Sequence, residues 1–261
     1  MTSSPAKPCA IVSGGATGIG SACAVILAER GYNVTVNYNR SADRAAAVVE
    51  RCRAAGAKAI AVQGDVADNA ACREVVRHSL DEWGGLDVLV NNAGVTHFAE
   101  ARDLDAQTKD DFQRIMSVNL VGSYQLTRAA VPHLNDSSIA SVVNISSHAG
   151  FSGLGSSSAY AASKGALNTL TLALARALAP KIRVNAVCPG FVDTDWMLPK
   201  LGAEKLAVFK QESARIAPLK RVVSPEDVAE AVSWFATGGR SITGQLLVID
   251  GGTHLSVGSP L

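Results

Sequence analysis

Short apolar segments alternate with helical segments along almost the whole 261-residue chain. Seven segments of four to six residues are predicted as strands, because they are apolar and bounded by turn residues: 9–12, 33–38, 57–62, 86–90, 141–145, 182–187 and 246–249. Helices are predicted between them at 21–30, 42–55, 69–82, 108–134, 159–179 and 224–237. Strands that alternate with helices form a parallel sheet with helices on both faces. We therefore expect a three-layer, doubly wound α/β fold.

The composition favours one domain across residues 1–261. Hydrophobic residues make up 48% of the chain, enough for a substantial core, and no proline-rich linker or internal repeat divides it. The alternation is interrupted only at 194–218, which is longer than a usual connection and carries Trp196, Met197 and Phe209. Long insertions in compact domains are often lids, so we expect a lid at about 194–218.

Charge and cysteine content exclude several other classes of protein. The net charge is +1 and no basic cluster occurs, so neither nucleic acid nor a membrane is an expected partner. Five scattered cysteines lack metal-ligand spacing, which predicts reduced thiols in a cytoplasm and no metal site. Neither the apolar core of a signal peptide nor a run long enough to span a bilayer is found.

A glycine-rich turn follows the first predicted strand and opens the first helix. It reads Gly14-x-x-x-Gly18-Ile19-Gly20. Glycines let the backbone approach a pyrophosphate, and the helix N-terminus supplies free N–H groups and a positive dipole end. Tight turns between a strand and a helix use glycine in any case. The position after the first strand is what favours a phosphate-binding turn.

Tyr160 and Lys164 lie four residues apart in a predicted helix and therefore on the same helix face. An ammonium close to a phenol favours the phenolate and lowers the tyrosine pKa, so that the pair could exchange a proton with a substrate near neutral pH. A lone pair of this spacing is common, and the alternative is an aromatic residue beside a solvated lysine. The other motifs of the chain decide between these interpretations.

Taken together, these motifs resemble the short-chain dehydrogenase/reductase family over roughly residues 8–252. The matching motifs are the glycine turn, Asp65-Val66, Asn91-Asn92-Ala93-Gly94, Asn119, Ser147, Tyr160-x-x-x-Lys164 and Pro189-Gly190. The length and glycine spacing match the shorter subtype of about 250 residues, and the chain looks most like 3-oxoacyl-[acyl-carrier-protein] reductases. The resemblance implies a Rossmann fold and an oxidoreductase that moves a hydride between a nicotinamide cofactor and a carbonyl or alcohol substrate.

The resemblance also implies roles for individual residues. Tyr160 would be the general acid, Lys164 would tune its pKa and hold the ribose, Ser147 would bind the carbonyl oxygen, and Asn119 would support a water chain to Lys164. Further residues would bind the cofactor: Gly14, Thr17, Gly18, Ile19, Gly20, Asn39, Arg40, Ser41, Asp65, Val66, Asn91, Ala93, Gly94, Pro189, Gly190, Val192 and Thr194. His97 and His148, beside motif residues, would border the substrate pocket.

The end of the second predicted strand favours NADP(H) over NAD(H). An acid there usually binds the ribose 2′-hydroxyl of NAD, whereas an arginine accommodates the 2′-phosphate. This chain has Tyr38 in that place, followed by Arg40, which can form paired hydrogen bonds to phosphate. Thr17 weakens the inference, because phosphate-binding relatives often carry a basic residue there, and NAD(H) stays possible.

Two other functions remain open, a sugar or polyol dehydrogenase and a nucleotide-binding sensor without catalysis. The complete set of Asn119, Ser147, Tyr160 and Lys164 disfavours the sensor. Extra apolar residues on the helices at 108–134 and 159–179 predict a homotetramer, because a helix that is apolar on several faces is buried on several sides. The last strand and the helix at 224–237 would form the second contact. The alternative is that these residues all belong to one subunit's core.

Overall fold

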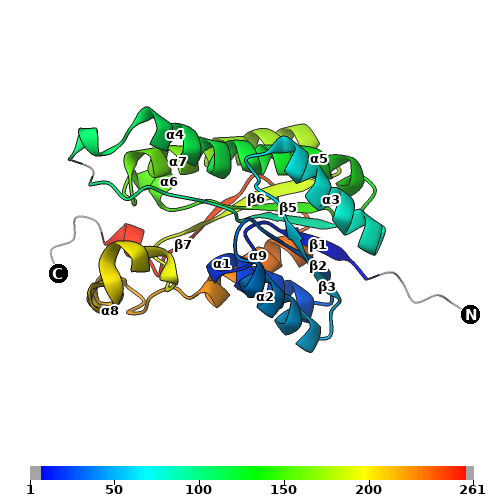
Figure 1. Cartoon of the computed structure of the whole chain (residues 1–261), viewed down its shortest axis with the longest axis horizontal. Coiled ribbons are helices and arrows are strands. Elements are labelled where there is room, and N and C mark those ends of the chain that lie inside the picture. Colours follow the sequence, from blue (N-terminus) through cyan, green and yellow to red (C-terminus); the bar gives the residue numbers. More distant parts are fainter. Residues whose placement is uncertain (1–6, 101, 257–261) are drawn as a thin grey trace, which may run out of the picture.

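The computed structural model describes residues 7–100 and 102–256. A seven-stranded parallel sheet in the order β3-β2-β1-β4-β5-β6-β7 forms its centre (Figure 1). The strands are β1 (Cys9–Val12), β2 (Asn33–Tyr38), β3 (Ala59–Gln63), β4 (Val88–Asn91), β5 (Ser141–Ile145), β6 (Arg183–Pro189) and β7 (Leu246–Ile249). The predicted Rossmann fold is confirmed. The strand order reverses between β1 and β4, which opens a crevice at the carboxyl ends of the strands.

Helices cover both faces of the sheet. In Figure 1, α1, α2 and α9 lie below it, while α3, α4, α5 and α7 lie above. The helices are α1 (Gly18–Glu29), α2 (Ala42–Ala54), α3 (Asn69–Trp83), α4 (Lys109–Met116), α5 (Ser123–Leu134), α6 (Ala149–Ser152), α7 (Ser158–Leu178), α8 (Leu198–Ile216) and α9 (Pro225–Thr237). Short turns η1 (Leu104–Ala106), η3 (Asp195–Met197) and η4 (Thr253–Leu255) are 3₁₀-helical, and η2 (Ser117–Gly122) is π-helical.

The apolar faces of these elements fill two cores, one on each side of the sheet. Leu27 of α1 and Phe235 of α9 are fully buried in the lower core, and Leu89 and Leu126 in the upper core. Strands of a parallel sheet are buried on both faces, which explains why they are apolar at almost every position rather than at every second one.

The structure departs from the predicted elements at several places, and β3, β4 and β6 differ from their predicted bounds by one or two residues. The predicted helix at 108–134 consists of α4 and α5 joined by the π-helical η2, and α1 begins at Gly18 instead of residue 21. The short helix α6 and the 3₁₀ turns lack the length that gives a periodic pattern. Within residues 7–100 and 102–256, no helix is long and apolar enough to cross a membrane, and no group of three or more metal-ligating side chains occurs.

Candidate active site

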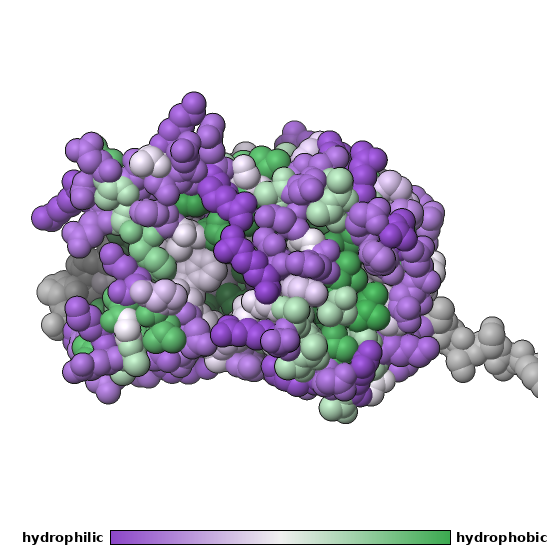
Figure 2. Space-filling view, in the orientation of Figure 1, coloured by the Kyte–Doolittle hydropathy of each residue, from purple (hydrophilic) through white to green (hydrophobic). Residues whose placement is uncertain are grey.

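A continuous cleft runs along the carboxyl ends of the strands. It has two joined parts with volumes of about 500 and 1050 Å³. Both parts are lined by Gly14, Thr17, Ala93 and Gly94, so the glycine turn and the loop after β4 lie where they meet. Figure 2 shows this face hollowed near its middle, with less polar residues visible inside the hollow. An elongated cleft that bends over a glycine turn suits a dinucleotide.

The glycine turn is so tight that it leaves no room for side chains at two of its glycines. Gly14 and Gly18 have φ values of 60° and 51°, in the left-handed region that favours glycine. A Cβ on Gly14 would lie 2.9 Å from the Ala93 Cα, and one on Gly20 would lie 2.3 Å from the Gly14 carbonyl oxygen. Thr17 precedes α1 without capping it through its side chain, so the first N–H groups of α1 face the cleft without a side-chain partner. These features fit a pyrophosphate.

The smaller part of the cleft has the residues expected around an adenosine. Asn39, Arg40 and Ser41 lie on one wall, and Asp65 and Val66 on another. The Asp65 carboxylate accepts hydrogen bonds from Asn39 Nδ2 at 3.0 Å and from the Ala67 amide at 2.9 Å, and both bonds fix the wall. The Arg40 guanidinium is exposed at the rim and makes no hydrogen bond or ion pair with another described residue.

Two histidines beside the motifs lie at different ends of the cleft. His97 lines the smaller part, and its Nδ1 is 3.2 Å from an Asp111 carboxylate oxygen. It therefore does not border the substrate pocket as expected. His148, which follows Ser147, does line the larger part.

Helix α7 brings Tyr160 and Lys164 to the larger part of the cleft, and the Ser157 hydroxyl caps this helix by accepting from the Tyr160 amide at 3.2 Å. The Lys164 Nζ lies 5.6 Å from the centre of the Tyr160 ring and donates to the Ile145 carbonyl oxygen at 2.8 Å. The ammonium is thus fixed to the carboxyl end of β5. The helix-face prediction for this pair is confirmed.

Burial dominates the acid–base properties of the pair. It raises the pKa of Tyr160 above its usual value, while the Ser147 hydroxyl acts in the opposite direction. Burial also lowers the pKa of Lys164 to about 8. The expected lowering of the Tyr160 pKa by the ammonium is therefore not found. Desolvation of the phenol disfavours the charged phenolate and has the largest influence on this pKa.

Two adjacent serines at the end of β5 have different surroundings. The Ser146 hydroxyl is buried, and its single proton lies between two acceptors, Asn168 Oδ1 at 2.5 Å and the Lys164 carbonyl oxygen at 3.1 Å. The Ser147 hydroxyl is only partly buried and makes one long contact of 3.5 Å to the Pro189 carbonyl besides accepting from the Ala149 amide. Both line the cleft, but only Ser147 has a hydroxyl proton free enough for a bound carbonyl.

Three predicted residues lie outside the cleft lining, namely Gly20, Asn91 and Asn119. Gly20 allows the close approach of α1 to the turn. The Asn91 amide points into the upper layer and donates to Thr127 and Asn144, both at 2.9 Å. These three residues therefore shape the walls of the cleft and are not part of its lining.

Asn119 is fully buried in the π-helical segment η2, between α7 and the loop after β4. Its Oδ1 accepts from the Val95 amide at 2.8 Å, and its Nδ2 donates to the Val95 carbonyl at 3.0 Å and to the Ser163 hydroxyl at 3.0 Å. These bonds use both Nδ2 hydrogens and one lone pair of Oδ1, so Asn119 fixes the loop beside Gly94. Its support of a water chain to Lys164 stays a prediction.

Asn92 and Arg44 are two of the cleft residues that the predicted set of site residues did not include. Asn92, and not its neighbour Asn91, lines the cleft, and its amide donates to the Ser13 and Gly14 carbonyls at 3.0 Å. Arg44 lines the larger part beside the glycine turn. Its position in the cleft was hard to predict from the sequence, because an arginine in the first turn of a helix usually faces water.

The segment after β6 forms the outer wall of the larger part. Pro189, Gly190, Val192 and Thr194 line it, as predicted from the family motif. The Thr194 hydroxyl accepts from the Trp196 amide at 3.3 Å and thereby starts η3. Helix α8 is kinked at Gly202, which has a φ of 71°.

Two contacts join α8 to the segment after β6. The Phe191 and Phe209 rings meet edge-to-face with centres 4.8 Å apart, and Lys210 forms an ion pair with Asp193. The contacts hold α8 beside the cleft in this structure.

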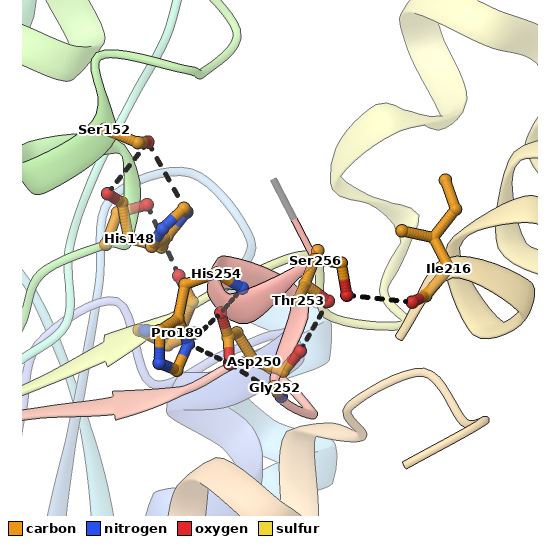
Figure 3. A network of polar contacts seen from close by, with 10 residues as sticks. His148, Ser152, Pro189, Ile216, Asp250, Gly252, Thr253, His254 and Ser256 are labelled. Atoms are coloured by element: carbon orange, nitrogen blue, oxygen red, sulfur yellow. Dashed lines mark hydrogen bonds and ion pairs between the residues drawn. The ribbon is translucent and has the colours of Figure 1, made fainter. Parts of the chain in front are cut away.

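A polar network at the C-terminal turn connects both sides of the cleft mouth (Figure 3). The buried Asp250 carboxylate accepts from the Gly252 amide at 2.9 Å and from the His254 amide at 2.8 Å, and its oxygens lie 2.9 and 3.0 Å from His254 Nδ1. The rings of His254 and His148 are 6.2 Å apart. Ser256 donates to the Ile216 carbonyl at the end of α8 at 3.2 Å. The turn therefore joins the loop of His148 to the end of α8.

Comparison with known proteins agrees with this geometry. A family model described as enoyl-(acyl carrier protein) reductase matches residues 14–254. The granaticin polyketide synthase ketoacyl reductase 2 of Streptomyces violaceoruber is 41% identical over 254 residues, covering 97% of this chain and 99% of that protein. A 3-oxoacyl-[acyl-carrier-protein] reductase of Staphylococcus aureus is 36% identical over 248 residues, covering 94% and 98%.

Solved structures agree as well. A short-chain dehydrogenase/reductase from Burkholderia xenovorans superimposes with a TM-score of 0.89 at 41% identity, covering 97% of this chain and 100% of that one. A short-chain dehydrogenase from Burkholderia cenocepacia in complex with NADP gives a TM-score of 0.83 at 40% identity, covering 94% and 97%. The chain therefore belongs to the short-chain dehydrogenase/reductase family of nicotinamide-dependent oxidoreductases.

Proposed function

We propose that the chain is an NADP(H)-dependent carbonyl reductase whose substrates are 3-oxoacyl thioesters or similar ketones. The observation that carries this proposal is the grouping of Ser147, Tyr160 and Lys164 around one cleft whose other part suits an adenosine phosphate. The named ketoacyl reductases among its relatives support the choice of substrate class.

Each of the three residues has a distinct task in the proposed reaction. The Ser147 and Tyr160 hydroxyls hydrogen-bond the carbonyl oxygen and orient the ketone. A bound nicotinamide would supply the hydride that attacks the carbonyl carbon. The Tyr160 hydroxyl gives its proton to the oxygen as the C=O double bond becomes an alcohol. Because the pKa of Tyr160 is raised, the phenol keeps its proton until the carbonyl oxygen of the substrate becomes negative. This order of events suits reduction.

Lys164 stabilises the state that follows proton transfer. Its ammonium, 5.6 Å from the ring centre, favours the phenolate left on Tyr160. The same group can bond ribose hydroxyls once it leaves the Ile145 carbonyl. A pKa of about 8 means that Lys164 is mostly protonated at neutral pH, as both tasks require.

Arg40 supports the choice of NADP(H). It stands at the rim of the adenosine part, where no carboxylate at the end of β2 competes for a 2′-hydroxyl. The NADP complex of the Burkholderia cenocepacia relative supports the same cofactor.

The family model's description raises enoyl reduction as a second candidate. The spacing of four residues between Tyr160 and Lys164 disfavours enoyl reduction. A chain that resembled the enoyl reductases would have its tyrosine and lysine further apart. The aromatic and aliphatic lining near Tyr160, which includes Phe98, Leu154 and Met197, disfavours a polyol. The proton-donor set disfavours a sensor, which needs no catalysis.

A substrate screen tests the proposal. Oxidation of NADPH and NADH is followed with an acetoacetyl thioester and a crotonyl thioester, and reduction of NADP⁺ and NAD⁺ is followed with a polyol. We expect acetoacetyl turnover with NADPH, and a loss of about 10²–10⁴-fold in Tyr160→Phe, which keeps the ring but lacks the proton. Turnover of the crotonyl thioester alone would establish the enoyl alternative, and no turnover with bound cofactor would favour the sensor.

We also propose a homotetramer in a reducing cytoplasm. Val121 and Tyr124 at the start of the α5 region and Leu172 of α7 are 44%, 43% and 48% exposed, while Trp234 of α9 is 49% exposed. A second copy would cover each of these two surfaces. The five cysteines are all buried free thiols, which suits reducing conditions.

A further inference from the structure

An exposed tryptophan lies beside the proposed proton donor. The Trp196 ring centre is 6.5 Å from that of Tyr160, with the planes tilted by 52°, and the residue is 44% exposed although it lines the cleft. Burying an exposed indole is favourable, so a ligand that covers it gains affinity.

The backbone of Trp196 lies close to the glycine turn. The Thr194 hydroxyl accepts from the Trp196 amide at 3.3 Å, and Thr194 Cγ2 would lie 3.4 Å from a Cβ on Gly18. The Trp196 ring, with its centre 6.5 Å from that of Tyr160, therefore lies beside both the turn and the proposed proton donor. When a ketone places its oxygen within about 3 Å of the Tyr160 hydroxyl, the groups attached to its carbonyl carbon therefore lie toward the indole ring.

The neighbouring walls are apolar and partly aromatic. Phe98 and Leu154 line the cleft from the loops after β4 and α6, and Met197 and Phe209 line it from the η3–α8 side. Leu154 is 66% exposed and Phe209 40% exposed. These four side chains and Trp196 form what we call the aromatic mouth.

From this geometry we propose that the aromatic mouth selects ketones that carry a flat aromatic ring one carbon away from the carbonyl, with Trp196 as the residue that recognises the ring. The inference rests on the proposed carbonyl reductase function. A flat ring can lie against the indole at the 4.5–7 Å centre distances that aromatic pairs prefer, whereas a saturated ring is thicker and lacks the π-face. The added interaction corresponds to about a two- to twelvefold preference.

A matched pair of ketones tests the inference. The substrates 2-tetralone and 2-decalone share a carbon skeleton and a carbonyl position, but only 2-tetralone has a benzene ring. We expect kcat/KM with NADPH to favour 2-tetralone in the wild type and in Trp196→Phe. In Trp196→Leu the ratio of kcat/KM for 2-tetralone to kcat/KM for 2-decalone should fall about two- to twelvefold, because leucine offers an apolar surface without a π-face. Trp234→Leu, which removes an exposed indole outside the cleft lining, should keep the wild-type ratio.

Binding of 2-naphthol to the enzyme, measured by calorimetry with NADP⁺ present, gives a readout without turnover. Its affinity should fall by the same factor in Trp196→Leu and stay near the wild-type value in Trp196→Phe. An unchanged ratio and an unchanged 2-naphthol affinity in Trp196→Leu would overturn the inference, as would a wild type without preference for 2-tetralone. If no ketone is turned over, the proposed function fails, and the calorimetric comparison still decides the role of Trp196.

Discussion

Lys164 is expected to destabilise the folded chain, and the effect should depend on pH. The residue is only 4% exposed, and burial lowers its pKa from 10.5 to about 8. Such a shift corresponds to roughly 3 kcal/mol between the two protonation states. Between about pH 8 and 10.5 the unfolded chain keeps a proton on this group that the folded chain has released. The contribution of Lys164 to stability is therefore least favourable below pH 8 and improves as the pH rises.

Replacing Lys164 with methionine isolates this effect. Met is unbranched and apolar, so it can occupy the buried channel, although the Ile145 carbonyl loses its partner. The free energy of unfolding is measured in urea from about pH 7 to 9.5 at one protein concentration. Relative to Lys164→Met, the wild type should gain about 2 kcal/mol over this range. Groups that do not interact with Lys164 cancel in the difference. Cys188 does interact with Lys164, but its pKa is raised to about 12, so it keeps its proton in the folded chain over this range.

An exposed lysine serves as the control. Lys181→Met removes the same charge from the surface and should give a difference that is small and flat with pH. If the difference between wild type and Lys164→Met were equally flat, the ammonium would not be desolvated as the structure indicates. A wild type that loses stability relative to Lys164→Met as the pH rises would contradict the sign of the shift.

Three further predictions follow from the cofactor part, α8 and the outer helices. Arg40→Ala should weaken NADPH binding by about ten- to a hundredfold, because a charge-assisted bond contributes about 1.5–3 kcal/mol, while NADH binding changes little; equal losses in a fluorescence titration would mean that Arg40 does not meet the 2′-phosphate. Amide hydrogen exchange in 194–218 should slow when cofactor is added, since we expect this segment to close over the cleft; unchanged exchange would indicate a rigid surface helix. Light scattering at micromolar concentration should give a tetramer, whereas a particle near 27.0 kDa would exclude both proposed contacts.

The arrangement of the sheet could be predicted from the sequence because each strand is a short apolar run between turn residues. Four strands, β1, β2, β5 and β7, have the predicted bounds. The glycine turn and the Tyr160–Lys164 pair were predictable for a related reason, because their geometry follows from local spacing within one turn or one helix. Both confirmed features depend on contacts between near neighbours in the chain.

The roles of the asparagines could not be derived in this way. Asn91 and Asn92 are adjacent in one motif, but successive residues at a strand end point in opposite directions, and the motif does not say which one faces the cleft. Asn119 was predicted in a regular helix, whereas its contacts with Val95 and Ser163 depend on a local widening of that helix. Such features are decided by partners 24 and 44 residues away.

The prediction of a lowered pKa for Tyr160 was wrong for a similar reason. Spacing correctly placed a positive charge on the same helix face, but the pKa also depends on how much protein surrounds the phenol. Desolvation is a property of the folded chain as a whole, and it is the largest influence on the pKa of Tyr160, which it raises. The sequence therefore indicated the partners of the proton transfer and not their titration.

The π-helical segment Ser117–Gly122 has a consequence for how homologous sequences should be aligned. A π-helical stretch accommodates an extra residue within an α-helix, and each residue of an α-helix turns the chain by about 100°. A homologue with one residue deleted here could continue as a plain α-helix, but its asparagine would turn away from the Val95 loop. We expect insertions and deletions to be rare within these six residues.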